Sequence, residues 1–279
     1  MTLIESMILG LVQGLAEFLP ISSSGHLAVL QYMFGVDTDN VLMFTVMLHF
    51  GTLISIFFAY RHDIWDLLKE LFALIKDIVT GQGIQMNKNE TRRLGIMIVI
   101  ATIPTAIIGL LFNDLFESFY SNITFIGVSL IITGTGLFFA ENKGGGDKGV
   151  MEMSIFNALL IGVFQAIAIC PGISRSGATM IGGLASRFER AHAVRFAFLI
   201  SIPSVLGAFL MELSTVFKHA ADGSGISPGI VLAGITVAAI SGYFAIKIMI
   251  KAVTDKKLIY FSFYTWIVGA LLVGYSILV

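Results

Sequence analysis

The sequence carries unusually little charge. Of its 279 residues, 13% are charged and 56% are hydrophobic, whereas a soluble domain carries roughly twice that charged fraction. Several windows exceed about 18 apolar residues with almost no charge, which is enough to cross a hydrocarbon core about 30 Å thick. The composition therefore excludes an ordinary soluble domain and predicts an all-α polytopic membrane protein.

The sequence also has a single cysteine and almost no net charge. A single cysteine, Cys170, excludes an internal disulfide and a cysteine-based metal cage. It lies in an apolar run and is interpreted as a small core residue. The formal net charge of −1 argues against nucleic acid as a partner. No basic stretch precedes the first apolar run, so no signal peptide is expected.

Six apolar segments are long enough to be membrane spans. They are predicted at 40–60, 93–112, 123–140, 191–211, 229–250 and 258–279. Between the first two, residues 62–80 place apolar side chains on one helical face and charged side chains mostly on the other, which predicts an interfacial amphipathic helix. The glycine-rich segment 141–149 is predicted to be a flexible linker between two halves.

Two further apolar segments, 3–18 and 155–169, are too short to be spans. At 1.5 Å per residue each reaches roughly 23 Å, short of the core thickness. Each meets a break rich in Pro, Gly and Ser and is followed by another short helical stretch. This pattern predicts two re-entrant helical hairpins, at 3–35 and 155–187, whose irregular backbone must be buried in protein or line a cavity.

The two hairpins are related by an ungapped shift of 152 positions. Glycines, glutamines and serines coincide in this alignment, in the pairs Gly10 and Gly162, Gln13 and Gln165, Ser22 and Ser174, Ser24 and Ser176, and Gly25 and Gly177. Each half, 1–141 and 150–279, then contains one hairpin and three spans. Because an odd number of crossings inverts the second half, the sequence predicts an inverted-topology repeat.

Basic residues predict the orientation. One side of the predicted topology collects 15 of the 17: Arg61, Lys69, Lys76, Lys88, Arg92, Arg93, Lys143, Lys148, Arg187, Arg190, Arg195, Lys247, Lys251, Lys256 and Lys257. The opposite side has Lys218 alone, and Arg175 falls at a hairpin break. The positive-inside rule makes the basic side cytoplasmic. Both termini are therefore predicted outside the cell membrane, with the site open to the outside.

The first break, in EFLPISSSGHLAV, combines an acid, hydroxyls and an imidazole. An ionisable group at membrane depth costs at least about 2.5 kcal/mol, so Glu17 and His26 are predicted to be functional. We expect catalytic roles for Glu17, His26 and Ser23. The serines precede a helix, where they either only cap it or help to form an anion site at its N-terminus. The residues predicted to bind substrate here are Gln13, Ser22, Ser24 and Gly25.

The second break, CPGISRSGATM, adds a positive charge. Arg175 is the one basic residue placed deep in the membrane by this reading, and a guanidinium can clamp a phosphate in two places. It is predicted to be catalytic; alternatively, it pairs with Glu17 to hold the hairpins together. Ser174, Ser176 and Thr179 are predicted to bind substrate. His49, within a span, either lines the pocket or packs in the core.

The motifs QGLAEFLPISSSGH and PGISRSGAT resemble those of the undecaprenyl pyrophosphate phosphatases, also called bacitracin resistance proteins, and the resemblance covers the whole chain. It implies hydrolysis of undecaprenyl pyrophosphate to the monophosphate and phosphate, feeding cell-wall synthesis. It also implies a divalent cation, Mg²⁺ or Ca²⁺, with Glu17 as a ligand. The important positions of the family fall on Glu17, Ser23, His26, Ser174, Arg175 and Thr179.

One departure from the family matters. Some members carry a second glutamate where this chain has Gln13, so a mechanism that needs two carboxylates on that face is doubtful here.

Two functions, alone or combined in one chain, are compatible with such a sequence. In the enzyme hypothesis, water or Ser23 attacks phosphorus with His26 as base or acid, Glu17 orients His26 or binds the cation, and Arg175 holds the pyrophosphate. Inverted repeats with broken helices also describe transporters and lipid flippases. The grouping of Ser23 with His26 favours the enzyme. The expected partners are a polyprenyl pyrophosphate and the lipid bilayer, and a homodimer is among the assemblies open to the chain.

Overall fold

The fold is entirely helical over the part of the chain that the computed structural model describes, residues 1–35, 38–120, 122–222 and 226–278. Within these ranges the side chains of 38–43, 143 and 212–222 are not described. The helices are α1 (Leu3–Phe18), α2 (Ser23–Met33), α3 (Thr38–Ala59), α4 (Arg61–Val79), α5 (Glu90–Leu111), α6 (Asn113–Phe119), α7 (Ile123–Lys143), α8 (Ile155–Ile167), α9 (Arg175–Ala185), α10 (Arg190–Asp222), α11 (Pro228–Thr254) and α12 (Leu258–Leu278).

Helices α5, α7, α10, α11 and α12 each contain a stretch long and apolar enough to cross a membrane. The described part of α3, Phe44–Ala59, reaches that standard together with α4, from which it is separated by an 86° bend. All six predicted spans coincide with helices, and the chain is a polytopic membrane protein. Two features were not predicted: the short helix α6, and the continuation of α10 to Asp222. The predicted spans ended where the apolar runs end, but a helix can continue beyond an apolar run.

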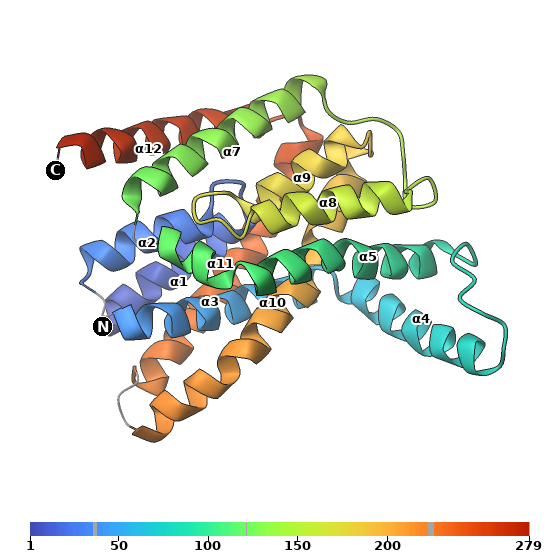
Figure 1. The fold of residues 1–279 in the computed structure, drawn as a ribbon, viewed down its shortest axis with the longest axis horizontal. Coiled ribbons are helices and arrows are strands. Elements are labelled where there is room, and N and C mark those ends of the chain that lie inside the picture. Colours follow the sequence, from blue (N-terminus) through green and yellow to red (C-terminus); the bar gives the residue numbers. More distant parts are fainter. Residues whose placement is uncertain (36–37, 121, 223–225, 279) are drawn as a thin grey trace.

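Each of the two short apolar segments packs most extensively on a helix of the other half. Helix α1 packs on α11, and α8 packs on α5 (Figure 1). A Cβ atom at Gly10 would lie 2.4 Å from the Gly234 carbonyl oxygen, and one at Gly162 would lie 2.2 Å from that of Ala101. The two matched glycines therefore permit the same close approach to a neighbouring helix backbone.

The breaks between α1 and α2 and between α8 and α9 lie against each other near the centre of the molecule (Figure 1). Their irregular backbone is hydrogen-bonded by protein groups. The Gly172 amide donates to Ser24 Oγ at 3.3 Å, and the Thr133 hydroxyl donates to the Gly172 carbonyl at 3.3 Å. Such internal pairing is what a non-helical segment at membrane depth requires.

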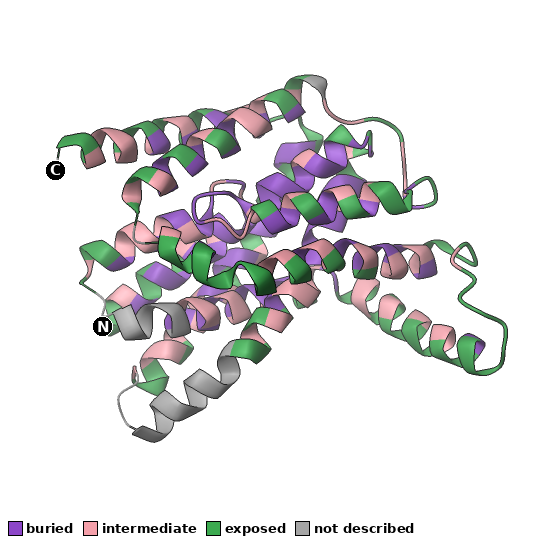
Figure 2. Cartoon of the chain, in the orientation of Figure 1, coloured by how far each residue is buried: buried purple, intermediate pink, exposed green. Residues whose placement is uncertain are grey.

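Burial is concentrated around these breaks, where the purple segments of Figure 2 gather. Eight of the eleven residues of α9 are buried, although many are small or polar. Both termini lie at one end of the molecule, and α4 projects from the other end (Figure 1). The helices thus hold the two polar breaks in the interior, between the two ends.

Candidate active site

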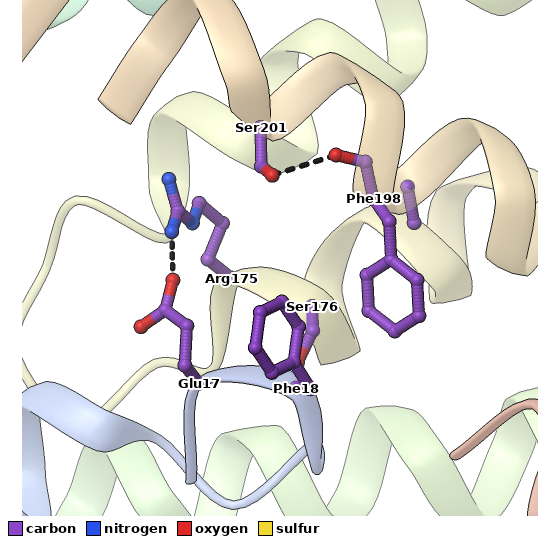
Figure 3. Close-up of a pocket in the computed structure, with 7 residues that line it drawn as sticks. Glu17, Phe18, Arg175, Ser176, Phe198 and Ser201 are labelled. Atoms are coloured by element: carbon purple, nitrogen blue, oxygen red, sulfur yellow. Dashed lines mark hydrogen bonds and ion pairs between the residues drawn. The ribbon is translucent and has the colours of Figure 1, made fainter. Parts of the chain in front are cut away.

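Glu17, in the last turn of α1, is the centre of the polar cluster. Its side chain is buried, and each carboxylate oxygen has partners. Oε2 accepts hydrogen bonds from Ser23 Oγ at 2.7 Å and from Gln13 Nε2 at 3.0 Å, while Oε1 pairs with Nη2 of Arg175 (Figure 3). The carboxylate thus lies within hydrogen-bonding distance of a hydroxyl, which is the geometry that a general base needs.

Arg175 comes from the opposite hairpin as the first residue of α9. Its contact with Glu17 is an ion pair, as one of the two readings of the sequence proposed. A buried ion pair gains little net stability, because desolvating both charges offsets most of their attraction. The pair does, however, bring the two breaks together and places the guanidinium beside Ser23 and Glu17. Structural pairing and assembly of the site are therefore two results of one contact.

His49, on α3, completes the contacts of Glu17. Its Nε2 lies 3.4 Å from Glu17 Oε2, and its Nδ1 lies 2.8 Å from the Thr45 carbonyl oxygen. Because only an N–H can bond to that carbonyl, Nδ1 carries a proton and the ring is fixed with Nε2 towards the carboxylate. From the sequence alone, His49 could either line the pocket or pack in the core. The structure places it in the site.

His26 has a different environment from the one expected. Its Nδ1 lies 2.8 Å from the Ser22 carbonyl oxygen, and its Nε2 lies 2.8 Å from the Tyr264 hydroxyl on α12. The two rings are also stacked, with centroids 5.7 Å apart. Among the contacts of the described residues, none joins His26 to Ser23 or Glu17, so the expected direct pairing is not formed. The sequence analysis missed Tyr264, since an apolar span offers no signal for one tyrosine.

The predicted substrate-binding hydroxyls mostly serve the helix starts. Ser22 caps α2 by accepting from the Gly25 amide at 3.3 Å, and Ser174 caps α9 by accepting from the Gly177 amide at 3.1 Å. Ser24 and Ser176 each lie 3.2 Å, oxygen to oxygen, from the capping serine of their own helix. Each cap leaves the other N–H groups of its first turn directed at the break, where they favour an anion.

Thr179 bonds within its own helix, because its hydroxyl donates to the carbonyl oxygens of Arg175 and Ser176. The first turn of α9 is therefore fixed by its own side chains. Ser22 adds a second constraint with a left-handed φ of 70°, a conformation that costs on the order of 1–3 kcal/mol and is characteristic of functional sites.

The cavity beside Glu17 and Arg175 is small. Its volume is about 10 Å³, and Phe18, Ser176, Ala197, Phe198 and Ser201 line the rest of it. Three of these side chains come from α10, and the Ser201 hydroxyl donates to the Phe198 carbonyl at 2.7 Å (Figure 3). A space of this size holds about one water molecule.

Comparison with known proteins decides the family. The family model described as Bacitracin resistance protein BacA matches residues 6–271. The chain belongs to this family. It is 47% identical to an undecaprenyl-diphosphatase of Alkaliphilus metalliredigens, over the full length of both chains. It is also 39% identical to one of Carboxydothermus hydrogenoformans, over 95% of this chain and 94% of that one, and 38% identical to one of Halothermothrix orenii, over 98% of both.

The residues of this BacA family member do not fit a resident divalent cation. Both Glu17 oxygens have donors, and the Arg175 guanidinium offsets the carboxylate charge. Among the described residues, the one unpartnered buried oxygen that the Glu17 cluster offers is Gln13 Oε1, and no group of three His, Cys, Asp or Glu side chains is close enough to hold a metal ion. Mg²⁺ in proteins usually binds one or two free carboxylates together with water and substrate phosphates, and Ca²⁺ needs more protein oxygens, whereas the carboxylate here already has donors on both oxygens.

Proposed function

We propose that this chain is an integral membrane phosphatase that hydrolyses undecaprenyl pyrophosphate to undecaprenyl phosphate and inorganic phosphate. The observation that carries the proposal is the cluster around Glu17, in which Ser23 and Arg175 bond to opposite carboxylate oxygens. The family membership and the names of the three relatives support it. The carrier alternative gains no support from those relatives.

The Glu17 cluster supports the following chemistry. Glu17 takes the proton of the Ser23 hydroxyl, and the serine oxygen forms a bond to the terminal phosphorus. The bridging P–O bond then breaks, and undecaprenyl phosphate leaves. After Glu17 has released this proton to solvent, it acts as base for a water molecule that attacks the phosphoserine, and the proton it takes passes to the departing Ser23 oxygen, which gives free phosphate and the restored hydroxyl. Direct attack by a water molecule in place of Ser23 uses the same carboxylate.

Arg175 and the helix starts stabilise charge on phosphorus. When substrate enters, the Arg175 guanidinium leaves its ion pair with Glu17 and binds the pyrophosphate instead, which frees the carboxylate to act as a base. The N-termini of α2 and α9 direct N–H groups towards the equatorial oxygens. His26, held by Tyr264, is the proposed general acid for the leaving phosphate. The implied Mg²⁺ or Ca²⁺ is proposed to arrive with the pyrophosphate, whose oxygens would supply most of its ligands.

The test is to measure phosphate release by the purified full chain and, during turnover, to trap any phosphorylated form of the protein. We expect undecaprenyl pyrophosphate to release one phosphate per molecule, and acid quenching to yield a phosphopeptide that contains Ser23. Ser23→Ala should remove the phosphopeptide. Release of phosphate by Ser23→Ala at the wild-type rate would exclude the serine as nucleophile and favour water. No release by the wild-type chain would reject the phosphatase function.

We also propose that the chain lies in the cell membrane with both termini outside and the site open to the outside. The distribution of basic residues supports this orientation, although the side chain of Lys218 is outside those that the structure describes. Exposed positions suited to a test are Gln82, between α4 and α5, and Asp114, in α6. In a Cys170→Ala background, Asp114→Cys should react with an impermeant maleimide added outside intact cells and Gln82→Cys should not. The reverse result would invert the topology.

A further inference from the structure

A second, larger cavity lies away from the Glu17 cluster, between α3 and α11. It is an open groove of about 320 Å³, lined mainly by apolar side chains. Ile54 and Phe58 form one wall, Ile240 and Phe244 form the other, and Arg61 and Tyr243 lie at one end. Phe58, Ile240 and Phe244 are more than half exposed in the isolated chain. A groove with such walls on two spanning helices fits a hydrocarbon chain.

Basic side chains gather at one end of this groove. Arg61 lines it, and the Lys247 ammonium lies 4.4 Å from the ring centroid of Tyr243, which also lines it. Lys251 follows Lys247 by four residues and so shares its face of α11. Among the ion pairs of the described residues, none includes Arg61, Lys247 or Lys251. By contrast, Arg92, Arg190 and Arg195 all have carboxylate partners.

The bend after α3 fixes the depth of these basic groups. The chain turns by 86° between Phe44–Ala59 and Arg61–Val79. Helix α4 then exposes a row of large apolar side chains, including Trp65, Phe72 and Val79, as an interfacial helix does. Arg61 therefore lies at the membrane–water boundary, where lipid phosphates lie, and the apolar walls extend from it towards the hydrocarbon core. The basic end lies where the headgroup of a phospholipid lies, and the apolar walls lie where its acyl chain lies.

We propose that the groove between α3 and α11 is a specific site for an acidic glycerophospholipid. One acyl chain lies between Phe58 and Phe244, and Arg61 and Lys247 bind the phosphate. The guanidinium supplies a planar set of donors for phosphate oxygens, while the ammonium acts as a point charge. The Nη1 of Arg61 already donates to the Phe58 carbonyl at 3.2 Å, which holds the side chain at the end of the groove. The lipid headgroup supplies the negative charge that these basic residues otherwise lack.

The test is binding of two lipids with the same acyl chains. Delipidated full-length protein in detergent is titrated with dioleoyl phosphatidylglycerol or dioleoyl phosphatidylcholine, and bound lipid is counted by native mass spectrometry. We expect one tight phosphatidylglycerol site and weaker phosphatidylcholine binding. Arg61→Gln and Lys247→Gln should each weaken the phosphatidylglycerol site about fivefold, because each basic group near a membrane surface contributes a similar factor. Equal binding of the two lipids would overturn the proposal.

Two further variants separate the groove from general charge. Lys256 lies just after α11 and does not line the groove. Lys256→Gln therefore removes one positive charge outside the groove and should bind phosphatidylglycerol as the wild type does. Ala239→Phe fills the groove without changing charge and should also weaken binding; unchanged binding there would overturn the acyl-chain site. The melting temperature of each variant, measured without lipid, shows whether the variant is folded. Tighter binding of undecaprenyl phosphate than of phosphatidylglycerol, lost in Arg61→Gln, would reassign the groove to the prenyl lipid.

Discussion

The two hairpin breaks share a backbone framework and differ in chemistry. Both begin their second helix with a serine cap, at 3.3 Å in α2 and 3.1 Å in α9, and both place another serine 3.2 Å from the cap. At the positions that follow from the 152-residue shift, however, Ile169 replaces Glu17 and Ala178 replaces His26. Each break could therefore bind an anion, but the carboxylate occurs in the first alone.

The charges of the two breaks are opposite and complementary. Arg175 occupies the position of Ser23, so the second break contributes the cation that the first one lacks. Two charges buried together cost far less than either charge buried alone. The comparison teaches that the repeated framework determines where an anion site can form, whereas the divergence between the halves places the carboxylate and the guanidinium together where the two breaks meet.

The largest expected effect comes from removing the one carboxylate. We expect Glu17→Gln to lower kcat by about a thousandfold, because a general base contributes a factor of this size, while the variant keeps hydrogen bonds to Ser23 and Arg175. The matched control is Ile169→Val at the equivalent position of the second break, which should retain wild-type turnover. Near-normal kcat in Glu17→Gln would mean that the two breaks do not differ in the way proposed.

Arg175→Lys is expected to lower kcat over a hundredfold although the charge is kept. Lysine lacks the planar fork that binds two phosphate oxygens, and the loss of such a contact in a dry site costs about 3 kcal/mol. Turnover at saturating substrate is measured together with the melting temperature. Wild-type turnover would show that Arg175 only joins the hairpins, and loss of both properties would point to a structural ion pair.

His49→Gln is expected to reduce kcat by about tenfold. Glutamine removes the ring that the Thr45 carbonyl orients and that places Nε2 3.4 Å from the Glu17 carboxylate. A residue that acts only through Glu17 should have little further effect in the Glu17→Gln background, since residues that act as one unit are not additive. Fully additive losses would contradict a role through the carboxylate.

Gly10→Ala and Gly162→Ala test the shared framework. Each added methyl group would meet a backbone oxygen at 2.4 or 2.2 Å, and overpacking of this kind costs about 1–3 kcal/mol. Both variants should melt at lower temperature by similar amounts. Gly207→Ala, with no atom within 4 Å of the new Cβ atom, is the control and should not lower the melting temperature. Loss of stability in one half only would show that the matched contacts are not equivalent.

The smallest effect concerns α4, the amphipathic helix that follows the 86° bend in the first half. Hydrogen bonds from Lys88 and Arg92 hold the pKa of Asp77 below its usual range. A carboxyl with a lowered pKa stabilises the docked helix above its unfolded pKa, and this contribution is lost as pH falls through the folded value. The protection factors of the amides in α4, which correct for the intrinsic pH dependence of exchange, should therefore fall at acidic pH. Asp77→Asn should show the faster exchange already at neutral pH, and unchanged exchange would contradict this role of the ion pairs.

Features set by neighbours in sequence could be predicted from the sequence by itself. Helix positions, the two breaks and their serine caps depend on hydrophobic periodicity and on residues within one turn, and the charge at the breaks identifies candidate chemistry. These local signals led to Glu17, Ser23 and Arg175, which the structure brings together.

The tertiary structure decided the features that depend on packing between distant segments. His49 reaches Glu17 from another helix, His26 turns to Tyr264 across 238 residues, and three side chains of α10 close the cavity. The physical reason is that periodicity specifies which face of a helix is buried but does not specify which side chain it meets. The sequence thus determined the chemical groups, and the packing of the helices decided which of them share one carboxylate.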